Sequence, residues 1–181
     1  MARLAHALLA LALIAPAAAH AAAPRKLSVE QRLQRIEDES DIRRILVQYG
    51  AYLDARDFAH YAALFAKDGE WIGGYGHFKG PAEIQKMLED KIGKGGPGYI
   101  NFDSYHLMSN PLIEIDGDKA HVVSKFMSTR KSADNKPVPG LSGRYVDDFV
   151  RENGKWKVRR RVTHGQIPWR DGDEPVSGPK P

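Results

Sequence analysis

The sequence predicts one α+β domain over residues 28–167, a cone in which a curled antiparallel sheet wraps around three N-terminal helices. Two observations indicate this fold class. Helical spacing of apolar residues is confined to the first half of the chain, and four long strand-like segments joined by hairpin turns follow it. Because a long sheet twists and curls, helices packed on its concave face should leave a cavity at one end.

Helices are predicted over residues 28–56, residues 58–65 and residues 82–92. Asp57 can cap the short second helix, and Pro81 suits the first turn of the third. The first helix carries an apolar stripe at helical spacing. Its members are Ile42, Ile45, Leu46, Tyr49, Tyr52 and Leu53.

Two short strands are predicted at residues 70–72 and 77–79, after a turn at Asp68 and Gly69. Hairpin signals such as Asn153-Gly154 separate the long strands that follow, and a polar loop precedes the third of them. The long strands are expected at residues 104–116, 119–131, 142–151 and 155–167, with the loop at residues 132–140.

Residues 1–21 have the organisation of a cleavable export signal. A positively charged start precedes an apolar run at residues 4–15, and small residues lead to an Ala-x-Ala cleavage site ending at Ala21. The run is too short to cross a bilayer core of roughly 30 Å, which disfavours the alternative of a membrane anchor. We expect a periplasmic or secreted protein without membrane contact after cleavage, and a disordered, proline-rich tail at residues 168–181.

The composition excludes several kinds of partner. A formal net charge of +4 is too small to indicate nucleic-acid binding, and without cysteine there are neither disulfides nor thiolate metal ligands. The histidines show no recognised metal-ligand spacing, and no glycine-rich phosphate motif is present. We therefore expect no metal site.

Three charged residues are candidates for chemistry, and each has a structural alternative. Asp54 ends the first helix, where the helix dipole disfavours a carboxylate, so either a functional role or a turn between helices accounts for it. His106 lies near the start of a long strand, where packing is the alternative to catalysis. Arg161 belongs to three consecutive arginines, a run that is usually solvated unless a strand bulge turns one side chain inward.

Period-two alternation places His106, Met108 and Asn110 on one face of their strand. Aromatic side chains elsewhere are candidates to line a pocket, with packing in the core as the alternative. They are Tyr49, Trp71, Tyr75 and Tyr145.

Short motifs follow one another in a fixed order along the chain. They are residues 42–49, residues 53–57, LFAKDGEW at 64–71, His106 with Ser109 and Asn110, DGDKA at 116–120, GRYVD at 143–147, and NGKWKV at 153–158 with Arg161. In this order they resemble the SnoaL-like branch of the nuclear transport factor 2-like superfamily, over about residues 28–166. The resemblance implies a cystatin-like roll with a pocket at its open end and proton-transfer chemistry without a cofactor. Members include scytalone dehydratase, ketosteroid isomerase, polyketide cyclases and lindane dehydrochlorinase.

The resemblance is closest to the dehydratase and dehydrochlorinase branch. It implies that Asp54 and His106 form a dyad, that Arg161 completes the catalytic site and that Trp71 lines the pocket. Tyr49 stands where the dehydrochlorinase has Lys or Gln, a departure that bears on recognition of the leaving group. The base of the steroid isomerases lies elsewhere, so that activity is not implied.

We therefore expect a dehydratase-type lyase or an isomerase acting on a small apolar cyclic substrate, with His106 as base and Asp54 orienting it. Two alternatives stay open: a non-catalytic ligand-binding domain, and an interaction domain that forms a homodimer or homotrimer, with dimers using the outer face of the sheet. Six residues are expected to contact the substrate. They are Tyr49, Trp71, Tyr75, Met108, Asn110 and Tyr145.

Overall fold

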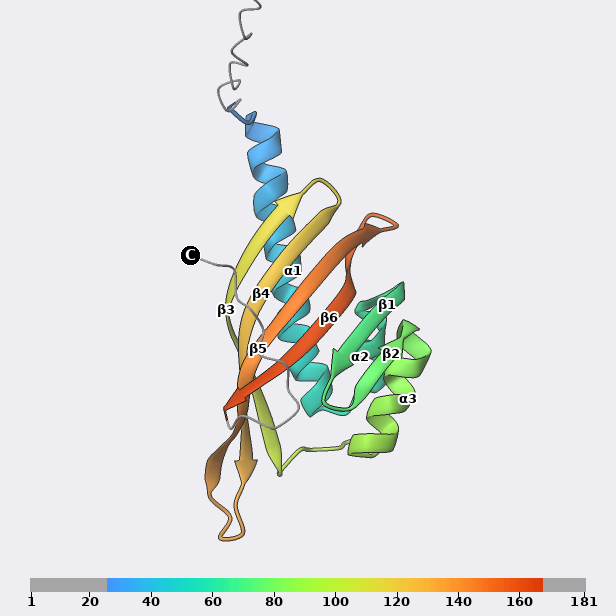
Figure 1. Cartoon of the computed structure of the whole chain (residues 1–181), viewed down its shortest axis with the longest axis vertical. Coiled ribbons are helices and arrows are strands. Elements are labelled where there is room, and N and C mark those ends of the chain that lie inside the picture. The colour runs from blue at the N-terminus through green and yellow to red at the C-terminus, as the bar shows by residue number, and fades with distance from the viewer. Residues whose placement is uncertain (1–25, 168–181) are drawn as a thin grey trace, which may run out of the picture.

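The computed structural model describes residues 26–167, in which helix α1 (Val29–Asp54) crosses the concave side of a curled, open sheet (Figure 1). Six strands follow the spatial order β2-β1-β6-β5-β4-β3. Helices α2 (Phe58–Ala63) and α3 (Gly80–Ile92) lie beside β1 and β2 at one end of the sheet (Figure 1). The α+β class is confirmed, whereas the predicted export signal and C-terminal tail lie outside the described residues.

The helix boundaries follow from their capping residues. Ser28 and Gln31 form a capping box in which each side chain accepts a hydrogen bond from the other's backbone N–H. Asp57 accepts the N–H of His60 and starts α2, as predicted. The second helix ends earlier than expected because Phe65 already begins a strand.

The strands are β1 (Phe65–Gly73), β2 (Gly76–Lys79), β3 (Ser104–Asp116), β4 (Lys119–Lys131), β5 (Pro137–Glu152) and β6 (Lys155–Ile167). The sheet is mixed because β1 runs parallel to β6, whereas the sequence predicted antiparallel strands only. No hairpin joins these two strands, so no turn chemistry dictates their relative direction.

Two predicted connections are part of strands instead. Asp68 and Gly69 lie within β1, where the register with β6 shifts, and a Cβ on Gly69 would lie only 2.7 Å from the carbonyl oxygen of Val158. The loop predicted at residues 132–140 is shorter, because β5 already begins at Pro137. Within the described residues β6 ends opposite Ser142, so this first stretch of β5 is an edge, where the missing N–H groups of proline are tolerated.

The core fills the space between α1, the two short helices and the inner face of the sheet. Ile42, Ile84, Val122 and Val158 are fully buried there and come from four different elements. Within residues 26–167 no helix is both long enough and apolar enough to cross a membrane.

Candidate functional site

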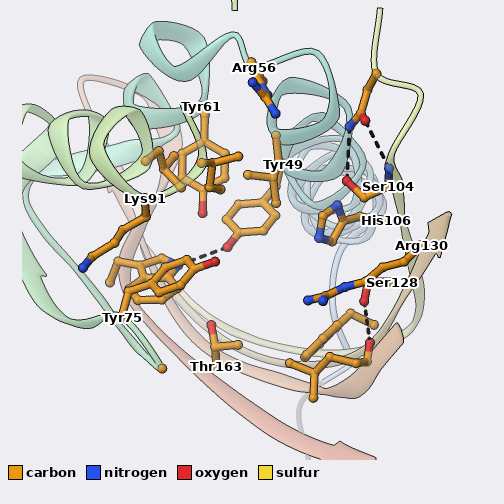
Figure 2. A pocket seen from close by; sticks show the side chains of 18 of the residues that line it. Tyr49, Arg56, Tyr61, Tyr75, Lys91, Ser104, His106, Ser128, Arg130 and Thr163 are labelled. Carbon is orange, nitrogen blue, oxygen red and sulfur yellow. Dashed lines mark hydrogen bonds between the residues drawn. The ribbon is translucent and has the colours of Figure 1, made fainter. Parts of the chain in front are cut away.

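A cavity of about 500 Å³ lies between the end of α1, helix α3 and the inner face of the sheet (Figure 2). Six aromatic side chains make up much of its wall. They are Tyr49, Tyr61, Trp71, Tyr75, Phe126 and Tyr145. The four aromatic residues predicted from the sequence are therefore all at this cavity, and Tyr61 and Phe126 are additional. The cavity is apolar enough to hold a small cyclic compound.

Two hydrogen bonds join Asp54 to His106, which lines the cavity, whereas Asp54 does not. The Nδ1 atom of His106 lies 2.6 Å from Asp54 Oδ1, and its backbone N–H donates to Asp54 Oδ2 over 2.9 Å. A carboxylate only accepts, so Nδ1 carries a proton and Nε2 of the neutral ring has a free lone pair. His106 lines the cavity, which makes Nε2 the nitrogen available to a ligand (Figure 2).

The close approach of α1 to β3 brings the two residues together. At Gly50, a Cβ atom would lie 3.4 Å from Met108 Cγ and 3.7 Å from the His106 carbonyl oxygen, so the helix and strand backbones are near each other. Asp54 lies one helical turn further on and reaches His106. The two hydrogen bonds compensate for the unfavourable position of a carboxylate at a helix C-terminus.

A bulge in β3 separates the residues predicted to share the face of His106. The register with β4 shifts between Ser109 and Leu112, and Asn110 is exposed with a φ of 48°. The prediction that Asn110 lies on the same face as His106 is therefore wrong, because an extra residue reverses the alternation. Met108 does point inward, but it packs against the core, and neither residue lines the cavity.

A second bulge, in β6, decides the direction of the arginine run. Asp148 pairs with Arg160 and Phe149 with Val158, which leaves Arg159 as the extra residue. Arg161 consequently points inward and is completely buried, as the bulge alternative predicted, whereas Arg160 is exposed.

Arg161 lies behind the cavity wall and is not one of the residues that line it. Its Nε and Nη2 atoms donate to the two carboxylate oxygens of Asp147 over 2.7 and 2.6 Å. Its guanidinium carbon lies 3.7 Å from the ring centroid of Tyr49 and 4.4 Å from that of Tyr145. Burial opposes its charge, but the attraction and hydrogen bonds of Asp147 prevail and raise the pKa of Arg161. It is therefore a fixed positive charge beneath two tyrosines.

The tyrosine hydroxyls form a polar group within the aromatic wall. Trp71 Nε1 donates to the Tyr49 hydroxyl over 3.1 Å, so that oxygen accepts a hydrogen bond. The Tyr49 ring lies 4.4 Å from that of Tyr61 and 5.4 Å from that of Tyr145. Burial raises the pKa of both Tyr61 and Tyr145 well above the ordinary value of a phenol, so both stay protonated.

Three further histidine–carboxylate pairs lie away from the cavity among the described residues, and one of them joins His77 Nε2 to Glu70 Oε2 over 3.0 Å. His121 Nδ1 is 2.9 Å from Asp148 Oδ1, and His60 Nδ1 is 2.7 Å from Asp57 Oδ2, but neither histidine lines the cavity and both are exposed. Within residues 26–167 no three histidine or acidic side chains gather as a metal site would require.

Several polar cavity residues were not predicted from the sequence. Ser128 and Arg130 follow Phe126 at period-two spacing on β4, and this alternation was the available signal. Arg56 and Lys91 also line the cavity, and nothing local in the sequence indicates this, because it depends on how α3 folds against the end of α1.

A family model for the SnoaL-like domain matches residues 34–162. This chain belongs to the SnoaL-like domain family. An uncharacterized protein of Mycobacterium tuberculosis (strain H37Rv) is 30% identical over 134 residues, which are 70% of this chain and 84% of that protein.

Solved structures of similar fold include two with enzyme names. A candidate scytalone dehydratase from Novosphingobium aromaticivorans is 25% identical, with a TM-score of 0.61 over 80% of this chain and 93% of that chain. A hexachlorocyclohexane dehydrochlorinase from Novosphingobium barchaimii is 19% identical, with a TM-score of 0.62 over 81% of this chain and 95% of that chain. A nuclear transport factor 2-like protein with a cystatin-like fold from Novosphingobium aromaticivorans is 21% identical, with a TM-score of 0.67 over 75% of this chain and 86% of that chain, and this similarity confirms the cystatin-like fold.

Proposed function

We propose that this SnoaL-like protein is an exported, cofactor-free lyase of the dehydratase type, or an isomerase, that acts on a small cyclic substrate. The observation that carries the proposal is the pair formed by Asp54 and His106. Both carboxylate oxygens of Asp54 hold His106, and the histidine lines an aromatic cavity large enough for a ring compound.

His106 is the proposed general base, and Asp54 is the proposed positioning residue. Nε2 of the neutral imidazole takes a proton from a carbon next to a substrate carbonyl group. Asp54 keeps the proton of His106 on Nδ1 and stabilises the imidazolium that forms. In an elimination the carbon–carbon double bond then forms, and a β-hydroxyl group takes the proton back and leaves as water. In an isomerisation the proton returns to another carbon.

The negative charge that develops on the substrate oxygen needs a donor. Tyr49 is the proposed donor, because its hydroxyl belongs to the cavity wall and its oxygen already accepts a hydrogen bond from Trp71. Arg161 supports this role from behind the wall, because its positive charge under the Tyr49 ring makes the phenol a stronger hydrogen-bond donor. We therefore place Arg161 as a positioning residue that does not touch substrate.

Two further points support the proposal. The structural relative that is 25% identical carries the name of a dehydratase, which fits the elimination chemistry. The export signal predicted at residues 1–21 fits a reaction without a nucleotide cofactor, because such cofactors are scarce outside the cytoplasm.

Replacement of His106 tests the function. The protein is screened against cyclic β-hydroxy ketones, and the best substrate is compared between wild type, His106→Ala and the matched control His121→Ala. We expect a loss of kcat of roughly 10²–10⁴-fold in His106→Ala and no loss in the control. If no member of the panel reacts although ring compounds bind, or if His106→Ala is as active as wild type, the domain is a ligand binder and the proposal fails.

A further inference from the structure

Three cations from three different elements line the cavity: Arg56 in the turn after α1, Lys91 on α3 and Arg130 on β4 (Figure 2). We call them the cation rim. Lys91 and Arg130 are exposed and Arg56 is half-buried, whereas the rings of Tyr49, Tyr61 and Tyr145 are buried.

The positive charge of the rim is poorly compensated within the cavity. Asp103 is the one acidic residue that lines it among the described residues, and Lys131 already pairs with that carboxylate over 2.8 Å. The hydrogen bond and charge of Lys131, and more weakly the charge of Arg56, hold the pKa of Asp103 below its ordinary value. The Asp103 carboxylate is therefore compensated mainly by Lys131, which does not line the cavity.

The rim residues themselves have few partners. Across residues 26–167 neither Lys91 nor Arg130 forms an ion pair, in contrast to Lys86, which binds Asp90 on the same helix as Lys91. Arg56 packs its guanidinium 4.6 Å above the ring of Tyr99, which fixes its position without neutralising it. Solvated surface cations usually alternate with acids, so three of one sign around one cavity indicate selection for an anion.

The opposite part of the cavity offers a polar contact of another kind. Thr163 lines the wall on β6, and its hydroxyl oxygen is buried without a hydrogen-bond partner among the described residues. Figure 2 shows it across the cavity from Arg56, with the aromatic wall between them. Because a buried hydroxyl is normally satisfied, a ligand oxygen is the expected partner.

From these observations we propose that the substrate of the His106 site is a cyclic carboxylic acid, with its carboxylate at the cation rim and a hydroxyl or carbonyl oxygen at Thr163. This inference rests on the proposed function, because it takes the ligand to be the substrate of the His106 site. It goes beyond the proposed function by assigning an ionised group, a carboxylate, to that substrate. A carboxylate suits the rim because arginine donates to it through two parallel hydrogen bonds. The ring between the two polar ends lies against the aromatic wall beside His106.

A paired-probe experiment tests the inference without turnover. Binding of 2-naphthoate and of the neutral 2-naphthamide is measured by calorimetry at low and high salt. We expect 2-naphthoate to bind at least about tenfold more tightly at low salt, and salt to reduce this ratio because the rim is exposed. In a triple variant with Arg56→Gln, Lys91→Gln and Arg130→Gln, the ratio should fall to about one.

A matched triple variant controls for net charge. Lys26→Gln, Arg32→Gln and Lys155→Gln remove the same charge from exposed positions that do not line the cavity, and they should leave the ratio unchanged. Equal binding of the two probes, binding of neither, or an equal loss in both triple variants would overturn the inference.

The His106→Ala variant separates this inference from the proposed function. It should keep the preference for 2-naphthoate while losing turnover. A preserved preference with undiminished turnover contradicts the proposed function alone. Lost turnover in a protein that never preferred the carboxylate contradicts the inference alone.

Discussion

Two pairs of an acidic and a basic side chain, Asp54 with His106 and Asp147 with Arg161, differ in how far they are exposed. Asp54 and His106 are joined over 2.6 Å and keep 17% and 23% of their side chains exposed, and His106 lines the cavity. Asp147 and Arg161 are joined over 2.6 Å as well, but both are completely buried. The first pair leaves one ring nitrogen available to a ligand, whereas Asp147 uses both carboxylate oxygens on Arg161.

The difference teaches that a short contact between charges does not by itself indicate catalysis. The sequence suggested Asp54, His106 and Arg161 as one catalytic set. The structure brings the first two together at the cavity and puts the third behind its wall, where it is held as a permanent charge. Access of a titratable nitrogen to the cavity separates a group that can transfer protons from one that stabilises the fold.

Breaking the buried pair should have the largest effect on stability. Arg161→Met leaves the Asp147 carboxylate buried without its partner, so the free energy of unfolding should fall by about 3–5 kcal/mol in urea denaturation. The double variant Arg161→Met/Asp147→Leu, which removes both charges, should regain most of the loss. If the free energy of unfolding of the single variant falls by less than about 1 kcal/mol, the pair of Asp147 and Arg161 does not stabilise the fold in this way.

Weakening the cavity pair should affect activity instead. Asp54→Asn removes the negative charge that stabilises the imidazolium, so kcat should fall by roughly 10²-fold while the urea midpoint changes little. Asp148→Asn, which changes the partner of the exposed His121, is the matched control and should retain wild-type kcat. An equal kcat in Asp54→Asn and wild type would remove the distinction between the two pairs.

A third carboxylate shows how such contacts affect stability as the pH changes. Burial alone would raise the pKa of Asp38, but hydrogen bonds from Arg151, Trp156 and Gln34 outweigh it and lower the pKa. A lowered folded-state pKa means that Asp38 stabilises the fold above the unfolded pKa of about 4, and that this contribution is lost as the pH falls through the folded-state value.

Asp38→Asn should therefore be less stable than wild type at pH 7, by about 2 kcal/mol, and its stability should decrease less on acidification. Urea midpoints at pH 7, 4 and 3 measure both effects. A wild type and variant whose stabilities fall in parallel would contradict the assignment.

The smallest effect is expected from Trp71→Phe. This change removes the hydrogen bond to the Tyr49 hydroxyl but keeps an aromatic ring in the wall, so kcat/KM should fall by about 3- to 10-fold, or about 1 kcal/mol. An unchanged kcat/KM would show that the hydrogen bond from Trp71 to the Tyr49 hydroxyl does not contribute to catalysis.

Local signals in the sequence predict the elements well, because their causes are local. The cap at Asp57 and the hairpin at Asn153 depend on a few neighbouring residues, and each is confirmed. The sequence could suggest where Asp54 and His106 lie, because Asp54 is near the end of a recognisable helix and His106 is near the start of a recognisable strand. Their contact could not be derived, since it depends on the close approach of α1 and β3 at Gly50.

What the sequence could not predict depends on bulges and on packing between distant elements. Polar residues occupy both faces of β6, so the inward direction of Arg161 was visible only from the bulge at Arg159. The bulge that exposes Asn110 does have a local signal, because Pro111 lacks the N–H group that a regular strand ladder uses. The parallel pairing of β1 with β6 and the convergence of the cation rim arise from tertiary packing alone.

The most direct test of the central claim, that His106 transfers a proton within the cavity, is solvent deuterium exchange into the best substrate. The wild-type protein in D₂O should introduce deuterium at the carbon next to the carbonyl group far faster than buffer. His106→Ala should exchange at the buffer rate, and Arg161→Met, under conditions in which it is folded, should still exchange faster than buffer. Exchange by His106→Ala at the wild-type rate would contradict the account.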